Sequence, residues 1–294
     1  MKIIGGPGSL ELARRVSESL KEPLASTRTK RFPDGEFYFK FEEDVSDQDL
    51  LVIQSLYPPQ DVRLVELFIM LHTARDLGAG SINVFIPYLA YSRQDERYLS
   101  GECLSSGMVA EMLERLSVDA LYTVDIHNEK VLGMYRIPTF NLTASGELAR
   151  YFAAKNLADP FVMSPDDEES AIKRAKNAAA TLDGAYDFFR KSRDCYTGEI
   201  TTYSKKLDAH GRDAIIIDDI ISTGKTSANA AKLLKKQGAR RVFVGASHVL
   251  LLGDSSKILT ESGVDEIVGT DSVANEYAKV SVAPILTRAL KEKL

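Results

Sequence analysis

Short apolar runs alternate with helix-period segments along most of this 294-residue chain. MKII and LLVIQSL open the series, and each precedes a segment with helical spacing, residues 9–20 and 61–77. INVFIPYL and ALYTVDIH continue it, and PFVMSP, AIIIDDII and RVFVGASHV repeat it in the second half. Strands that alternate with helices form crossover units. The alternation therefore predicts an α/β fold of mostly parallel sheets flanked by helices.

The two halves of the sequence also resemble each other. LLVIQSLYPP, the helix expected at 61–77 and INVFIPYLAYS match AIIIDDIIST, the helix expected at 225–237 and VFVGASHVLLL in order and approximate spacing. This match indicates internal duplication. We expect two tandem domains, 1–143 and 144–282, that meet near the turn-prone segment NLTASG. The C-terminal helix 283–294 is a candidate to pack back on the first domain.

Composition argues against several classes of protein. With 44% hydrophobic residues the chain can bury a sizeable core, and no run approaches the roughly 18 apolar residues of a membrane span. A net charge of -5 argues against nucleic-acid or anionic-membrane partners, which normally demand a basic face. Cys103 and Cys195 match neither a CxxC nor a zinc pattern, so no disulfide framework or metal finger is expected. We expect a cytoplasmic protein.

The segment IIIDDIISTGKT, residues 215–226, carries the most distinctive chemistry. It fails the nucleotide P-loop pattern, because the position five before Gly224 holds Asp219 instead of glycine. Backbone N–H groups and two hydroxyls at the start of the next helix suit a phosphate. The paired acids Asp218 and Asp219 suit the two neighbouring hydroxyls of a ribose. The alternative is that they only cap a turn.

Five further segments carry polar residues near expected strand ends or turns: 30–41, 87–102, 122–130, 161–170 and 188–196. Four of them have a simpler structural explanation. Turn chemistry accounts for Pro-Asp-Gly in the first, solvation for the charges of the second, and a charged strand edge for the last. A single histidine such as His127 is often structural, although its place after a strand favours a functional role. Asp166 has the corresponding place in the second domain.

On these motifs the chain resembles the ribose-phosphate pyrophosphokinases, also called phosphoribosyl pyrophosphate synthetases, over nearly its whole length. IIIDDIISTGKT is similar to the ribose 5-phosphate loop of type I phosphoribosyltransferases. The sequence departs from the family at Lys225, where glycine is common, and at Asp167–Glu169, where the family stretch is often glycine-rich. The resemblance implies two tandem type I phosphoribosyltransferase-like domains, the first binding ATP and the second ribose 5-phosphate.

The resemblance also implies roles for individual residues. The residues implied to bind ATP are Phe32, Asp34, Glu36, Arg93 and Gln94. Those implied to bind ribose 5-phosphate are Asp218, Asp219, Ser222, Thr223, Gly224, Lys225 and Thr226. His127 and Asp166 are the implied supports of Mg²⁺, and Lys191 and Arg193 match a catalytic pair that introduces a loop closing over the reactants.

The implied reaction transfers the β,γ-diphosphoryl group of Mg-ATP to the C1 hydroxyl of ribose 5-phosphate, giving phosphoribosyl pyrophosphate and AMP. The implied assembly is a homo-oligomer, a dimer or larger, whose active sites are shared between subunits. One alternative is a type I phosphoribosyltransferase, which would need only one such domain. Another is a catalytically silent regulatory subunit, although the implied active residues are present.

Overall fold

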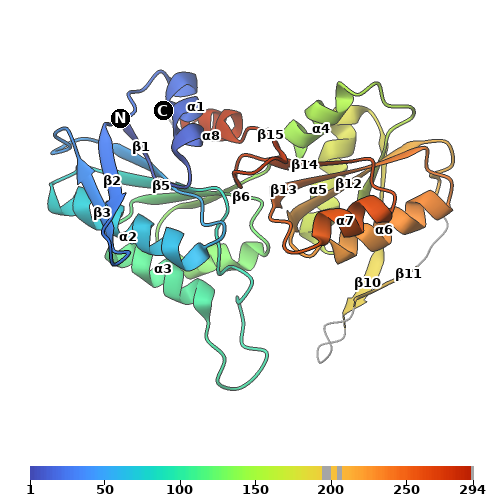
Figure 1. Cartoon of the computed structure of the whole chain (residues 1–294), viewed down its shortest axis with the longest axis horizontal. Helices are drawn as coiled ribbons and strands as arrows, with labels where there is room; N and C mark the ends of the chain where they lie inside the picture. Colours follow the sequence, from blue (N-terminus) through green and yellow to red (C-terminus); the bar gives the residue numbers. More distant parts are fainter. Residues whose placement is uncertain (194–199, 204–206, 293–294) are drawn as a thin grey trace. The chain divides into compact units, whose positions relative to one another are not determined.

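The computed structural model describes residues 1–193, 200–203 and 207–292 (Figure 1). The chain divides into two compact units. Unit 1 contains Met1–Leu142 and Ser281–Leu294, and unit 2 contains Thr143–Val280. Within the described ranges, no helix is both long and apolar enough to cross a membrane.

Unit 1 is built on a parallel sheet in the order β1-β4-β5-β6-β7, with a separate antiparallel hairpin, β2–β3. Its strands are β1 (Lys2–Gly5), β2 (Thr27–Arg31), β3 (Phe37–Phe41), β4 (Leu50–Ile53), β5 (Ile82–Ile86), β6 (Ala120–Val124) and β7 (Thr139–Leu142). Its helices are α1 (Leu10–Leu20), α2 (Gln60–Asp76), α3 (Ser105–Arg115), the 3-10 helix η1 (Glu129–Met134) and α8 (Ala283–Lys291).

Unit 2 is built on a parallel sheet in the order β15-β14-β13-β12-β8-β9, also with a separate antiparallel hairpin, β10–β11. Its strands are β8 (Phe161–Ser164), β9 (Ala185–Phe188), β10 (Arg190–Arg193), β11 (Ile200–Tyr203), β12 (Asp213–Ile221), β13 (Arg241–Val249), β14 (Glu266–Thr270) and β15 (Ala278–Val280). Its helices are α4 (Ser145–Ala153), α5 (Glu169–Leu182), α6 (Lys225–Lys236) and α7 (Ser255–Glu261).

The strand orders confirm the internal duplication. The series β8-β12-β13-β14-β15 repeats β1-β4-β5-β6-β7, and β9 is an additional strand at the edge of the second sheet. The two hairpins also hold corresponding places in chain order, because each lies before the second strand of its series. Parallel sheets follow from the helical crossovers that the sequence pattern predicts.

The two units exchange their final helices. Helix α4 follows β7, the last strand of unit 1, but it belongs to unit 2 and packs against α5. Helix α8 follows β15, the last strand of unit 2, but it belongs to unit 1 and packs against α1 (Figure 1). The helix that follows each repeat therefore completes the other repeat.

Strand β12 is buried on both faces, which explains its continuous apolar run. Ile216 packs in a cluster with Ala231 and Leu234 of α6. Ile215 and Ile217 pack on the opposite face, in a cluster that includes residues of α4 and α5. Successive strand residues point to opposite faces, and burying each isoleucine contributes about 1.5–3 kcal/mol.

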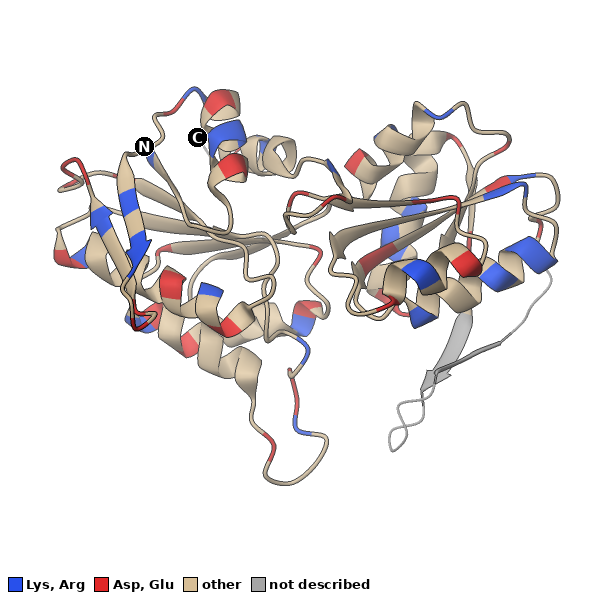
Figure 2. Cartoon of the chain, in the orientation of Figure 1, with Lys and Arg blue, Asp and Glu red and all other residues tan. Residues whose placement is uncertain are grey.

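Helix α6 has a buried face and a lysine-rich face. Its buried positions Ser227, Ala228, Ala231 and Leu234 follow helical spacing. The blue positions along this helix in Figure 2 are lysines, and Lys235 and Lys236 lie in its last turn, where positive charge interacts favourably with the helix dipole. After the helix, Gly238 adopts a φ of 89°, a conformation that glycine provides at little cost.

A buried acid, Asp213, fixes the beginning of β12. Its Oδ1 accepts from Arg240 Nε at 2.8 Å, and its Oδ2 accepts from Arg241 Nη2 at 2.7 Å and from the Ala158 amide at 2.8 Å. Burial favours a higher pKa for Asp213, but the hydrogen bonds from Arg240 and Arg241 outweigh burial and hold the pKa well below its ordinary value.

We expect Asp213→Asn to lower the free energy of unfolding at pH 7 by about 2 kcal/mol, because it removes a buried charge whose arginine partners remain partly hydrated. The folded-state pKa lies below the unfolded value of about 3.9, so the stabilisation is complete above that pH and is lost as the pH falls below it. Urea unfolding at pH 7 and pH 3 should show the gap to wild type narrowing at low pH. Asp208→Asn, at a 93% exposed side chain, is the control. A gap independent of pH would contradict the assignment.

Candidate active site

The acid pair lies within β12, which continues to Ile221. β12 pairs with β13 from Asp213 to Ile221, but its pairing with β8 extends only from Ala214 to Ile216. The longer partner β13 continues the strand through Asp218 and Asp219, beyond the end of β8. Asp218 and Asp219 therefore lie beyond the end of β8, at the carboxyl edge of the sheet, where ligands bind in open α/β folds.

Asp219 forms a buried ion pair with Arg174 of α5. The Nη2 atom of Arg174 lies 3.2 Å from Asp219 Oδ1, and both side chains are 7% exposed. The strand alternation explains this partner, because Asp219 continues the face of Ile215 and Ile217, which α5 covers. A guanidinium held this way stabilises the ionised form of Asp219.

The surroundings of Asp218 disfavour its ionised form. Burial, together with the charge of Asp219, raises the pKa of Asp218 well above its ordinary value, and Arg174 opposes the shift. Asp218 also accepts the backbone N–H of Asp219 at 2.9 Å through Oδ1. Two adjacent buried carboxylates repel each other, so the site favours a ligand that supplies hydroxyl donors or positive charge.

Asp166, in the loop after β8, brings a third carboxylate toward the pair. It is buried, and its charge contributes to the raised pKa of Asp218. Its Oδ1 accepts from the backbone N–H of Glu168 at 3.2 Å, whereas Asp167 and Glu168 are exposed. Across the described residues, no group of three His, Cys, Asp or Glu side chains could hold a metal ion.

The turn 222–226 leads from β12 into α6 and is held by the loop that follows β13. The carbonyl of Ser222 accepts from the amide of Leu252 at 2.9 Å and from Ser255 Oγ at 3.1 Å. Gly224 adopts a φ of 71°, and a Cβ there would lie 3.2 Å from Leu259. Thr223 and Lys225 are exposed, and α6 begins at Lys225. The turn presents backbone N–H groups at a helix N-terminus, a favourable place for phosphate.

In unit 1, the structure brings the segment of Arg93 and Gln94 next to that of His127. Asn128 donates a hydrogen bond through Nδ2 to Asp95, joining the two loops. Gln94 Oε1 accepts from Ser105 Oγ at 2.5 Å, so the start of α3 holds its side chain. Arg93 and His127 are both exposed. Both follow strands of this sheet at its carboxyl edge, Arg93 after β5 and His127 after β6.

The hairpin β2–β3 presents Phe32, Asp34 and Glu36 at its exposed tip. Phe32 is 40% exposed, with its ring edge-on to Tyr38 at 5.9 Å and Lys30 Nζ 4.7 Å from its centroid. The Phe32 amide donates to the Glu36 carbonyl at 2.9 Å, and the Glu36 amide donates to Asp34 Oδ1 at 3.1 Å. These hydrogen bonds define the backbone of the turn while its side chains are exposed, so an aromatic ring is available for stacking on a base.

Lys191 and Arg193 lie on β10, which pairs antiparallel with β11. Their side chains fall outside the part of the structure that is described, as does Cys195. Their catalytic role therefore stays a prediction.

Comparisons with known proteins agree with this architecture. The model of the N-terminal domain of ribose phosphate pyrophosphokinase matches residues 1–116, and that of the phosphoribosyl synthetase-associated domain matches 204–291. The ribose-phosphate pyrophosphokinase of Sulfurisphaera tokodaii is 38% identical over 286 residues, covering 97% of each chain. That of Methanothermobacter thermautotrophicus is 36% identical, covering 99% of this chain and 100% of its own.

The chain belongs to the ribose-phosphate pyrophosphokinase family. The fold agrees as well. The crystal structure of phosphoribosylpyrophosphate synthetase from Mycobacterium smegmatis matches with a TM-score of 0.84 and 28% identity, covering 100% of this chain and 99% of that chain.

For a ribose-phosphate pyrophosphokinase, the structure groups the candidate residues by unit. Unit 2 gathers Asp166, the acid pair and the turn 222–226, whereas unit 1 gathers the segments of Arg93 and His127 and carries the Phe32 hairpin separately. Sequence reasoning missed Arg174 and Asn128. Arg174 had a detectable signal, because it is the one charged residue at the helical spacing of Ala171, Ala175 and Ala178 on the buried face of α5.

Proposed function

We propose that this protein transfers the β,γ-diphosphoryl group of ATP to the C1 hydroxyl of ribose 5-phosphate, giving phosphoribosyl pyrophosphate and AMP. The observation that carries the proposal is the buried pair Asp218–Asp219, next to a turn that offers backbone N–H groups to a phosphate. A ribose with a 5-phosphate satisfies both requirements, and the family's full-length relatives carry the name of this activity.

Each unit has a proposed task. In unit 2, Asp218 and Asp219 accept hydrogen bonds from the ribose hydroxyls, and Ser222, Thr223, Gly224, Lys225 and Thr226 hold the 5-phosphate. In unit 1, Arg93 and Gln94 contact ATP, and Phe32, Asp34 and Glu36 recognise adenine. In phosphoryl transfer the protein mainly aligns the reactants and neutralises the charge on the phosphates. We assign this neutralisation to Lys191 and Arg193.

We propose Mg²⁺ as the cofactor, with His127 and Asp166 as its supports. When bound with ATP, Mg²⁺ neutralises phosphate charge. The buried carboxylate of Asp166, whose charge acts on Asp218, fits an ion that takes one or two carboxylates and completes its shell with phosphates and waters.

The nucleotide product tests the proposed function. The protein is incubated with ATP, Mg²⁺ and ribose 5-phosphate, and the nucleotides are separated. We expect AMP and phosphoribosyl pyrophosphate in equal amounts, and no AMP when ribose 5-phosphate is omitted. ADP with a doubly phosphorylated ribose would indicate an ordinary kinase, and turnover of phosphoribosyl pyrophosphate with a base would indicate a phosphoribosyltransferase.

We also propose a homo-oligomer, at least a dimer, in which the hairpin tip of one subunit serves the ATP of another. The exposed Phe32 supports this proposal. Phe32→Ala and Asp219→Asn proteins are mixed under subunit exchange, at substrate concentrations so low that each variant alone has little activity. Mixing should restore part of the activity, because mixed dimers contain one site free of both changes. Demonstrated exchange with no recovery, or a fully active monomer, would contradict sharing.

We place the protein in the cytoplasm. Cys103 is an exposed free thiol, which a reducing compartment preserves. Recovery of the protein in the membrane or secreted fraction of its host would contradict this placement.

A further inference from the structure

We propose that Arg31 and Glu66 are positioning residues that hold the tip of the β2–β3 hairpin in the shape that receives adenine. The inference rests on the proposed function, because it assigns a purpose to the hairpin through its role in ATP recognition. It concerns two residues to which the sequence motifs assign no role. Neither is proposed to touch the nucleotide.

Arg31 contacts the turn and the body of unit 1 with the two ends of one guanidinium. Its Nη1 donates to the carbonyl of Gly35 at 3.0 Å, within the turn, and its Nη2 forms an ion pair with Glu66 Oε1 on α2. The turn itself is short and exposed. Its Gly35 adopts a φ of 97°, and a glycine can adopt other backbone conformations at little cost. A planar guanidinium can satisfy both acceptors at once, and it thereby restricts the turn.

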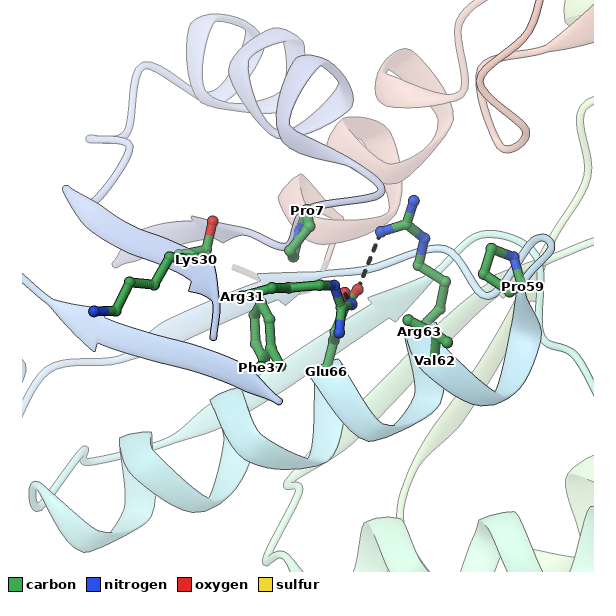
Figure 3. A pocket seen from close by; sticks show the side chains of 9 residues that line it. Pro7, Lys30, Arg31, Phe37, Pro59, Val62, Arg63 and Glu66 are labelled. Atoms are coloured by element: carbon green, nitrogen blue, oxygen red, sulfur yellow. Dashed lines mark hydrogen bonds and ion pairs between the residues drawn. The ribbon is translucent and has the colours of Figure 1, made fainter. Parts of the chain in front are cut away.

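Glu66 is a rigid anchor for this contact. It is 2% exposed, and its Oε2 accepts from Arg63 Nη1 at 3.0 Å and from Gln54 Nε2 at 3.2 Å. Gln54 in turn accepts the amide of Gly8 through Oε1 at 3.1 Å. A continuous set of hydrogen bonds therefore runs from the end of β4 through α2 to the hairpin tip. Figure 3 shows Arg31 and Arg63 converging on Glu66.

Gln54 relates this hydrogen-bond network to the duplication of the fold. The segment Gln54-Ser55 corresponds to Asp218-Asp219 of the other repeat. In unit 1 the amide side chain accepts from one neighbour and donates to another, which a carboxylate cannot do. The position that faces the sugar in unit 2 supports the hairpin in unit 1.

The neighbouring cavity does not favour a separate anion site. It has a volume of about 610 Å³ and is lined by Arg31, Arg63 and Glu66 among others. Both guanidinium groups already contact the Glu66 carboxylate, and Lys30 points away from it in Figure 3. Burying the Glu66 carboxylate costs free energy unless both arginines stay in contact with it. The pair of contacts therefore agrees with a role of Glu66 in fixing the position of Arg31.

The experiment compares steady-state kinetics of wild type with Arg31→Ala, Arg31→Lys and Glu66→Gln. Arg31→Ala and Glu66→Gln should each raise the KM for ATP by about tenfold, the loss expected when one charge-assisted contact no longer fixes the geometry. The KM for ribose 5-phosphate and kcat should stay within about twofold. Arg31→Lys should retain most of the defect, because one ammonium group cannot reproduce the fork of contacts.

Arg28→Ala is the matched control, since it removes an exposed arginine from the same strand, where it pairs with Glu42 at 2.8 Å. It should leave the three kinetic constants unchanged. Backbone hydrogen exchange provides a second readout: amides of residues 32–36 should exchange faster in Arg31→Ala than in wild type or Arg28→Ala.

Three results would overturn the inference. One is an unchanged KM for ATP in both Arg31→Ala and Glu66→Gln. Another is an equal rise in the KM for ribose 5-phosphate, which would indicate general damage. The third is unchanged hydrogen exchange at the tip. A wild-type protein that forms no AMP would instead overturn the proposed function, and with it the stated purpose of the hairpin, whereas exchange would still report whether Arg31 holds the tip.

Discussion

Replacing Asp219 by asparagine is expected to raise the KM for ribose 5-phosphate by about 10- to 100-fold while the KM for ATP changes little. A hydrogen bond to a charged acceptor contributes about 1.5–3 kcal/mol, and the substitution removes such an acceptor from the proposed sugar site. It also leaves Arg174, which is 7% exposed, without its carboxylate at 3.2 Å. Asp218→Asn should act in the same direction but less strongly, since Asp218 is not the partner of that ion pair.

Isothermal titration with ribose 5-phosphate, together with kinetics at varied ATP, measures both effects. Asp167→Asn is a suitable control, because this exposed acid lies beside Asp166 without belonging to the pair. Unchanged sugar affinity in both Asp218→Asn and Asp219→Asn would contradict the assignment. So would an equal loss of affinity for both substrates.

Lys191→Ala and Arg193→Ala are each expected to lower kcat by about 100-fold, on the order of 3 kcal/mol, with substrate affinities nearly intact. Charge that develops during transfer is stabilised only in the transition state, so its loss lowers turnover more than binding. Arg190→Ala removes a charge from the adjacent position of β10 and is the matched control.

Single-turnover kinetics at saturating ATP and ribose 5-phosphate isolates the chemical step from product release. If either variant raised KM at normal turnover, the residue would serve substrate binding alone. If Arg190→Ala were equally slow, the positive charge of the strand, and not the Lys-Arg pair, would be responsible.

Local sequence patterns were sufficient to predict the frame of the fold and the strand that carries the acid pair. The apolar run Ile215–Ile217 demands burial on both faces, and acids that follow such a run are costly without a ligand or partner. The duplicated order of elements could be predicted for the same reason, since each apolar run marks a strand and each periodic segment a crossover helix.

Other features could not be predicted because they depend on contacts between residues distant in sequence. Arg174 and Asp219 are 45 positions apart, and Arg31 and Glu66 are 35 apart. A local pattern shows that Arg174 lies on a buried helix face, but its partner depends on which strand face α5 covers. The length of β12 could not be predicted either, because it depends on how far β13 extends as its pairing partner.

Because of the exchanged helices, unit 1 contains both ends of the chain. Unit 2 is one continuous segment that starts with α4 and β8, whereas unit 1 combines the first part of the chain, which starts with β1, and the last helix, α8. A chain shortened to Val280 would retain every residue of unit 2, yet it would expose the face of α1 that α8 covers. Loss of the carboxyl-terminal helix would thus lower the stability of unit 1, which also contains the amino terminus, and would leave the residues of unit 2 intact.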